Sequence, residues 1–447
     1  MKVMYKNKSI ITQAIPLVIT AIFFIASFSM CKNTSNKKVN EQTASVVIKK
    51  DTMRIRPLTN VKYERTEQRL KQGAYLTTGI LQCFACHSQR NWNDPIAPII
   101  EGTYGSGGTV LLKDSANLII APNITPDKET GAGTWTDDML GRAIREGVGH
   151  DGRVLYWQMP SSTFRNLSDE ELASVVVYLR SIPAVRHVVP PSKFPDDLRS
   201  EIRKSLQPIT KPVAAPDLSD SLKRGRYLVR LGECVGCHTS HSEYSPGILG
   251  GGNYIDRFGR NVFSANITID PAGISYGREA FIFVIRTGKG GTLSPVMPWI
   301  SFKNMTDSDL NAIYTYLETI PPSRHYVSNQ KPFTKCEICG MEHGFGNRNK
   351  RERPQGIKSD PELYSKYAGT YLNEEDSSSY TVIKQGDTLI AMSPWTNGAK
   401  TEMIPQSELH FMAAGWPVGV SFIKNKNGDI TGLAEDTDYG RIFKKIK

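Results

Sequence analysis

The clearest pattern of apolar positions along the chain occurs twice. In residues 172–179 and again in residues 310–317, apolar side chains recur at i, i+3, i+4 and i+7, which predicts one apolar helix face in each stretch. A capping pair precedes each stretch and a proline ends it: Ser168 with Glu171 and then Pro183, and more weakly Thr306 with Asp309 and then Pro321. These faces are typical of core packing.

The two helices close two copies of one longer module, predicted at residues 63–183 and 218–321. Each copy opens on a helix with a central glycine, Gly73 or Gly225, across which we expect the closing helix to pack. The next shared segments are Asn-Ile-Thr at 123–125 and 266–268, and Met-Pro at 159–160 and 297–298. The first copy also carries a predicted helix over 137–146. The sequence therefore predicts two mainly α domains.

From about residue 362 the pattern changes to short strands. The β-like runs are 380–384, 388–392, 409–412, 418–423 and 430–433, with hairpin turns at 385–387 and 427–429. A small all-β domain is therefore expected over 362–447. Two linkers separate the three domains, a proline-rich one at 184–217, with an amphipathic patch at 197–206, and a second at 322–361.

The first 31 residues predict a targeting segment. Lysines precede a mostly apolar run at 14–28, as in a secretory signal, and Cys31 at its end is the candidate lipid anchor of a lipoprotein. A polar tether is expected at 32–62. An uncleaved membrane anchor is the alternative. Both interpretations place the rest of the chain outside the cytoplasm, in the periplasm and attached to a membrane through the N-terminus.

Composition narrows the class of protein. The 447 residues are 39% hydrophobic and include 37 glycines and 26 prolines, which fits a loop-rich soluble protein rather than a membrane bundle. The net charge of +11 favours acidic partner proteins or anionic surfaces. No basic stripe with interleaved aromatic residues is present, so the sequence predicts no nucleic-acid partner.

Two Cys-x-x-Cys-His motifs carry the candidate chemistry. They are Cys83-Phe-Ala-Cys86-His87 and Cys234-Val-Gly-Cys237-His238. This spacing is typical of c-type haem attachment, in which both thiols bond the porphyrin and the histidine binds iron from one face. The motifs predict two covalently bound haem c groups, with His87 and His238 as proximal ligands. A disulfide or half of a zinc site is the alternative.

Met159 and Met297 are the predicted distal iron ligands, because each follows its motif at a distance that leaves room for chain to wrap a haem. Thioether ligation favours ferrous iron and raises the reduction potential. The rivals are Met139 and His150 for the first haem and Met305 for the second.

Cys336 and Cys339 remain after these assignments. Cys336-Glu-Ile-Cys339-Gly340 is similar to a haem motif in which glycine replaces histidine. Outside the cytoplasm a disulfide is the favoured interpretation. Binding of a soft metal through these cysteines with Met341 or His343 is the alternative.

The modules resemble class I c-type cytochromes, and more closely the multihaem cytochrome c subunits of bacterial membrane-linked alcohol and gluconate dehydrogenases. The resemblance spans about 63–321 and is carried by residues 123–131, Trp135, residues 143–147, Gly152 and Met159-Pro160. The second copy is looser. The C-terminal part resembles the lipocalin-like β-domain appended to some serine-β-lactamase-like hydrolases.

The resemblance implies a dihaem cytochrome that carries electrons from a partner dehydrogenase to an oxidase or another cytochrome of the respiratory chain. No catalytic nucleophile or general base stands out, so we expect an electron-transfer protein or a dehydrogenase subunit. The alternatives are a dihaem peroxidase-like enzyme and a haem-based sensor, and both need an iron with an open face.

Overall fold

The computed structural model describes residues 55–240, 246–290, 293–350, 355–374, 378–394, 400–414, 419–435 and 441–446. The predicted signal segment, Cys31 and the tether up to residue 54 lie outside these ranges. Within the described part of the chain, no helix combines the length and the apolar character that a membrane crossing requires.

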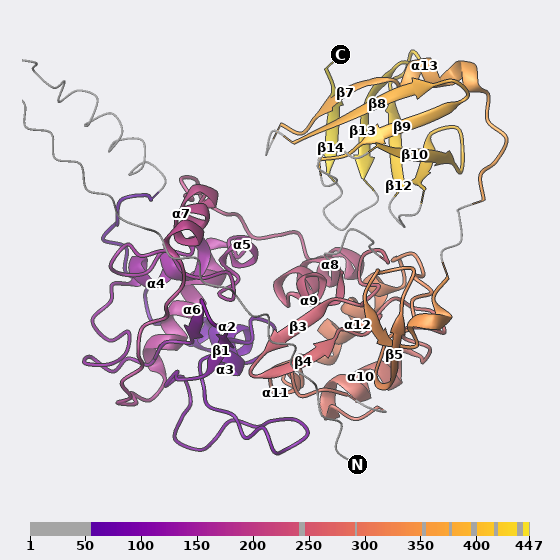
Figure 1. Cartoon of the computed structure of the whole chain (residues 1–447). Helices are drawn as coiled ribbons and strands as arrows, with labels where there is room; N and C mark the ends of the chain where they lie inside the picture. Colours follow the sequence, from indigo (N-terminus) through magenta and orange to yellow (C-terminus); the bar gives the residue numbers. More distant parts are fainter. Residues whose placement is uncertain are drawn as a thin grey trace, which may run out of the picture. The chain divides into compact units, whose positions relative to one another are not determined.

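Two helical units repeat the same order of elements (Figure 1). The first contains α2 (Glu67–Thr78), α3 (Cys83–Cys86), β1 (Val110–Lys113), β2 (Leu118–Ile120), α4 (Asp137–Glu146), α5 (Ser161–Phe164) and α6 (Asp169–Ser181). The second contains α8 (Ser221–Leu231), α9 (Cys234–His238), β3 (Tyr254–Arg257), β4 (Arg260–Phe263), α10 (Arg278–Thr287), α11 (Trp299–Phe302) and α12 (Asp307–Leu317). The internal repeat in the sequence is thus a repeat of structure.

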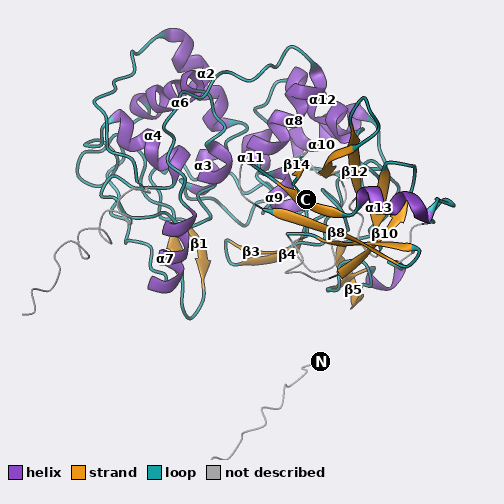
Figure 2. Cartoon of the chain, turned by 90° about the horizontal axis from the view of Figure 1, so that it is seen from above, coloured by secondary structure: helices purple, strands orange, loops and turns teal. Residues whose placement is uncertain are grey.

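The first and last helices of each unit cross at the predicted glycine. Helices α2 and α6 lie side by side, as do α8 and α12 (Figure 2). A Cβ atom on Gly73 would lie 2.0 Å from the Ser174 carbonyl oxygen, and one on Gly225 would lie 1.9 Å from that of Ala312. Both distances are far inside van der Waals contact, so only glycine permits this approach. The predicted packing is confirmed.

The predicted caps and apolar faces are also present. Ser168 and Glu171 form a complete capping box at α6, and the Thr306 side chain caps α12. The apolar faces of α6 and α12 lie in one core that is continuous through both units. Burying such a face supplies most of a helix's stability in a protein.

Both segments expected to be linkers contain regular structure. Residues 184–217 include α7 (Asp196–Ser205). Residues 322–361 include a hairpin of β5 (Ser328–Lys335) and β6 (Glu342–Gly344), a 3₁₀ turn η1 (Gly346–Arg348) and the start of η2 (Pro361–Leu363). This second segment contains four cysteine and histidine residues with no exposed surface, three in the hairpin and one just before it, and they are described below.

The C-terminal part is a closed antiparallel barrel, drawn in orange and yellow in Figure 1. After α13 (Tyr364–Tyr367) the strands are β7 (Gly369–Leu372), β8 (Ser379–Gln385), β9 (Thr388–Met392), β10 (Lys400–Pro405), β11 (His410–Ala413), β12 (Gly419–Lys424), β13 (Ile430–Glu435) and β14 (Ile442–Lys445). Each pairs with the next, and β14 pairs with β7 to close the barrel. Aromatic side chains fill its core, among them Tyr371, Phe411 and Phe443. The architecture is consistent with the predicted lipocalin-like domain.

Candidate functional site

Each haem motif forms a short helix with its two cysteines on one turn. The residue before each motif, Gln82 or Glu233, has a left-handed backbone, with φ of 55° and 58°. Such a conformation costs a residue other than glycine roughly 1–2 kcal/mol. The same conformation recurs at the same position in both units. It is therefore part of how the chain enters the motif helix and not a local irregularity.

The two motif histidines are held alike. The His87 ring donates from Nδ1 to the Pro122 carbonyl at 2.8 Å, and the His238 ring donates from Nδ1 to the Ala265 carbonyl at 2.7 Å. Because Nδ1 carries the proton, Nε2 keeps its lone pair for a metal. Burial lowers the pKa of both rings, which favours this neutral form.

Asn-Ile-Thr builds the loop that carries those carbonyls. Asn123 Oδ1 accepts bonds from the Thr125 backbone at 3.0 Å and hydroxyl at 2.7 Å. Asn266 repeats both with Thr268, at 2.8 and 2.7 Å. All four residues are buried. The Asn-Ile-Thr segment therefore fixes the carbonyl that orients the motif histidine.

One glycine in each unit contacts both the motif histidine and the loop of the Asn-Ile-Thr segment. Gly107 donates its N–H to the His87 carbonyl at 2.8 Å, and Gly251 does so to that of His238 at 2.7 Å. A Cβ on either glycine would lie 2.4 Å from the backbone of the loop that carries the Asn-Ile-Thr segment. Their φ values, +70° and +73°, also require glycine.

Met159 and Met297 occupy matching turns just before α5 and α11. The prolines that follow them have nearly the same conformation, with φ −80° and ψ 54° at Pro160 and φ −80° and ψ 60° at Pro298. Both methionines are half-buried and pack against the core that the units share. The structure thus places the two predicted distal ligands in equivalent positions.

The rival ligands have other surroundings. The Met139 sulfur accepts the Thr136 N–H at 3.5 Å and helps to cap α4. Met305 is 2% exposed and packs in the core. The His150 ring stacks on Trp135 with centroids 4.3 Å apart.

Several buried side-chain nitrogen atoms lie in the part of the sequence that follows the first motif. Among the described residues, Arg142 Nε, Arg145 Nε and Nη2, and His150 Nδ1 have no hydrogen-bond partner. Arg145 is anchored by an ion pair with Asp169 at 2.7 Å. The unpaired guanidinium N–H groups of the two arginines suit the propionate groups of a haem, and two thiols on one turn beside an oriented imidazole suit its attachment. The residues present therefore fit a covalently bound haem.

Reciprocal contacts join the two units. Tyr227 donates to Glu171 at 2.7 Å, and Tyr75, its equivalent in the first unit, donates to Asp309. Gln82 bonds the Gly232 carbonyl at 2.8 Å. Burial raises the pKa of the Cys237 thiol, and Cys86 lies close enough to add to that rise. The two motifs are therefore near neighbours across this contact.

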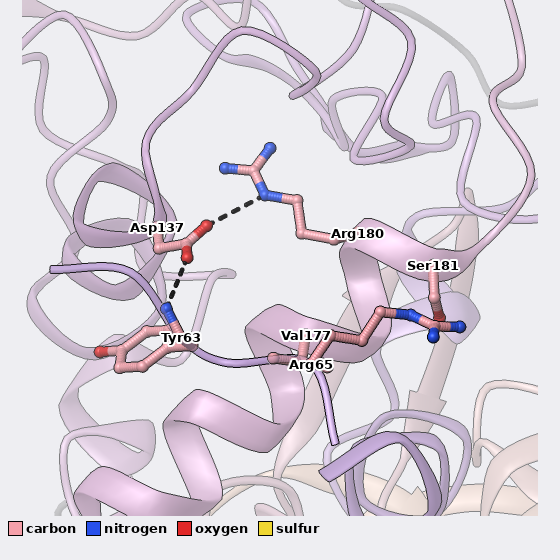
Figure 3. A pocket seen from close by; sticks show the side chains of 6 residues that line it. All are labelled: Tyr63, Arg65, Asp137, Val177, Arg180 and Ser181. Carbon is pink, nitrogen blue, oxygen red and sulfur yellow. Dashed lines mark hydrogen bonds and ion pairs between the residues drawn. The ribbon is translucent and has the colours of Figure 1, made fainter. Parts of the chain in front are cut away.

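A small pocket of about 80 Å³ lies elsewhere in the first unit (Figure 3). Its lining residues are Tyr63, Arg65, Asp137, Val177, Arg180 and Ser181. Asp137 accepts from the Tyr63 N–H at 2.9 Å and pairs with Arg180 at 3.2 Å. None of the predicted haem residues lines it.

Cys336 and Cys339 are thiols in the structure, so the predicted disulfide is not formed there. Both are fully buried and lie with His325 and His343. Sequence reasoning missed His325. The available signal was the Arg-His pair that follows Ile-Pro in both copies, at 186–187 and 324–325.

Comparison with known proteins confirms the resemblance. The chain is 29% identical over 281 residues to the cytochrome c subunit of the quinone alcohol dehydrogenase of Gluconacetobacter polyoxogenes, covering 57% of this chain and 56% of that protein. It is 33% identical over 184 residues to the gluconate 2-dehydrogenase cytochrome c subunit of Pantoea cypripedii, covering 39% and 38%. It is 27% identical over 256 residues to a diheme c-type cytochrome of Cereibacter sphaeroides, covering 54% and 82%.

Homologues of the chain are thus cytochrome c subunits of alcohol, fructose and gluconate dehydrogenases and a diheme cytochrome c. The chain spans about half the length of the dehydrogenase subunits it matches. No protein-family model matches it. The homology implies covalently bound haem c.

Proposed function

We propose that this chain is a dihaem c-type cytochrome that transfers electrons outside the cytoplasm, from a partner dehydrogenase towards the respiratory chain. The observation that carries the proposal is the repeated geometry at residues 83–87 and 234–238, where two thiols share a turn with an imidazole held through Nδ1. When bound, the haem iron supplies one-electron exchange.

The residues of the chain have distinct parts in this proposal. Cys83 with Cys86, and Cys234 with Cys237, hold the porphyrins through thioether bonds. His87 and His238 present Nε2 from one face, and Met159 and Met297 present sulfur from the other. The half-buried, core-packed position of both methionines supports this assignment.

The contact between the units supports electron exchange within the chain. The paired tyrosine–carboxylate bonds fix one motif relative to the other, and Cys86 and Cys237 lie within electrostatic range. An electron accepted at one site would then pass to the other site within the same chain and leave from there.

The proposed setting follows from the N-terminus and the relatives. A signal segment with a lipid on Cys31 would anchor the protein to a membrane on the periplasmic side. Relatives named as cytochrome subunits of alcohol, fructose and gluconate dehydrogenases support a dehydrogenase as donor. The net charge of +11 favours an acidic partner surface.

Spectroscopy of the full-length holoprotein tests the proposal. Met159→Ala and Met297→Ala should each remove one of two methionine–iron charge-transfer bands, while Met139→Ala, the matched control, should keep both. The parent protein should be low-spin and inert to peroxide and carbon monoxide. A high-spin haem that turns over peroxide would favour the peroxidase instead, and ready binding of carbon monoxide would favour the sensor.

A further inference from the structure

Four side chains that could ligate a metal gather outside the haem motifs. They are His325, Cys336, Cys339 and His343, and one ligand atom of each lies within 4.8 Å of those of all the others. Each of the four residues has 0% of its surface exposed. Met341, the other candidate from the sequence, is 36% exposed and contributes backbone groups: its carbonyl accepts the Cys336 N–H at 2.9 Å, and its backbone also hydrogen-bonds Cys339.

The geometry of the cluster approaches that of a tetrahedral site. Cys336 Sγ lies 3.4 Å from His325 Nε2, and Cys339 Sγ lies 3.2 Å from His343 Nε2. Zinc bonds of about 2.3 Å to sulfur and 2.0–2.1 Å to nitrogen, at tetrahedral angles, separate neighbouring ligand atoms by roughly 3.3–3.8 Å. The four atoms therefore need only small adjustments to surround one ion.

Hydrogen bonds already orient the ligands. His325 donates from Nδ1 to the Gly250 carbonyl at 2.8 Å, and His343 donates from Nδ1 to the Gly344 carbonyl at 3.0 Å, which leaves both Nε2 lone pairs facing the sulfurs. The Cys339 N–H points at Cys336 Sγ at 3.4 Å. Gly340, at φ +74°, turns the chain back towards β6.

A disulfide would serve this cluster poorly. It would place a weak acceptor beside two buried imidazole nitrogens, and neither Nε2 lone pair would then face an S–H donor from these cysteines. Two thiolates and two neutral imidazoles around a divalent ion sum to no net charge, so that arrangement suits a buried site. All-protein Cys₂His₂ ligation is typical of structural zinc.

We propose that His325, Cys336, Cys339 and His343 bind a structural zinc ion. The metal would join the β5–β6 hairpin to His325, whose ring donates to the Gly250 carbonyl and packs against the loop at 250–252. A Cβ on Gly252 would lie 2.5 Å from the His325 ring and 3.4 Å from Cys339 Sγ. Gly251 in that loop donates to the His238 carbonyl. The site therefore supports the proximal side of the second motif.

Purified full-length protein tests the site without reference to the proposed haem function. Elemental analysis should find one zinc per chain, and zinc-edge X-ray absorption should resolve two sulfur and two nitrogen neighbours. Iron in the same sample reports independently on the haem proposal. Absence of zinc, both as isolated and after incubation with zinc under reducing conditions, would overturn the inference, as would a disulfide between Cys336 and Cys339 in the mass spectrum of the native protein.

Variants supply the second test. Cys339→Ser and His343→Ala should each lose the bound zinc, whereas Met341→Ala, beside the cluster but outside the ligand set, should keep it. If a ligand variant fails to fold, the X-ray absorption result on the parent protein still decides. Retention of full zinc by the Cys339→Ser protein would contradict the assigned ligands.

Discussion

The two helical units share the geometry around their Cys-x-x-Cys-His motifs and differ in the contacts that support it. In the first, His187 donates from Nδ1 to the Ser106 carbonyl at 3.0 Å, and a Cβ on Gly108 would lie 2.6 Å from its ring. His325 and Gly252 repeat this arrangement in the second. Only the segment that follows the second unit, at 322–361, adds two cysteines and a further histidine. A packing histidine present in both copies has thus become a candidate metal ligand in one.

The difference shows which features the site needs. Four features occur in both units, so we infer that the proposed haem sites need them. They are the motif helix, the left-handed residue before it, the carbonyl that accepts from the motif histidine, and the turn that carries the methionine. The Cys₂His₂ cluster occurs once, beside the second unit, so we expect it to stabilise that unit alone. The following predictions test this division, from the largest expected effect to the smallest.

Loss of one motif should remove one haem and spare the other. Cys83→Ala with Cys86→Ala, or Cys234→Ala with Cys237→Ala, should lower iron from about two atoms per chain to about one, because the double variant has no thiol left in that motif to form a thioether. Elemental analysis and the mass of the denatured chain measure this. Two haems retained in either double variant would refute the assignment of that motif.

The helix crossings should be equally intolerant of a methyl group. Gly73→Ala and Gly225→Ala each place a Cβ against a backbone carbonyl, at 2.0 and 1.9 Å, and should lower the free energy of unfolding by about 3 kcal/mol. Denaturant unfolding measures the change. Gly277→Ala is the control, since a Cβ there meets nothing within 4 Å. A large loss in one unit alone would break the structural equivalence.

The contact between the units should weaken when either tyrosine loses its hydroxyl. Tyr227→Phe removes a bond to Glu171, whose carboxylate keeps its bond from Ser168, so the expected loss of unfolding free energy is about 1 kcal/mol. Tyr75→Phe should behave similarly at Asp309, which retains Arg224. Thermal unfolding compares the two. No effect from either would argue against this contact in solution.

The smallest expected effects are spectroscopic, and they should distinguish the histidine side of one proposed haem from that of the other. Cys339→Ser should change the electron paramagnetic resonance spectrum of only one ferric haem, the one attached at 234–238. The change would be transmitted by the loop at 250–252. His187→Ala should change only the other haem and leave zinc bound. Spectra in which either substitution alters both haems alike would show that the supports are not separate.

Much of the fold could be predicted from the sequence because its signals are local. The capping pairs and apolar spacing predicted α6 and α12, and the helix expected over 137–146 is α4. The central glycines predicted the crossings. In the barrel, β10 was missed because it carries Lys400, Glu402 and a terminal Pro405, which disguise its alternation.

The remaining features depend on contacts distant in sequence. The segment at 322–361 looked like a linker because its cysteines have no second pair at a recognised zinc spacing. Only the fold brings His325 to a cluster 11 residues downstream and to Gly250, 75 residues upstream. The role of Asn-Ile-Thr could not be predicted either, because the segment acts through a backbone carbonyl, which leaves no pattern in the sequence.

Mass spectrometry of the mature, denatured protein tests the central claim most directly. The account predicts an intact mass that includes two haems, and after proteolysis one haem on the peptide with residues 83–87 and one on the peptide with residues 234–238. A denatured chain with the mass of the bare polypeptide, with its haem free in solution, would contradict it.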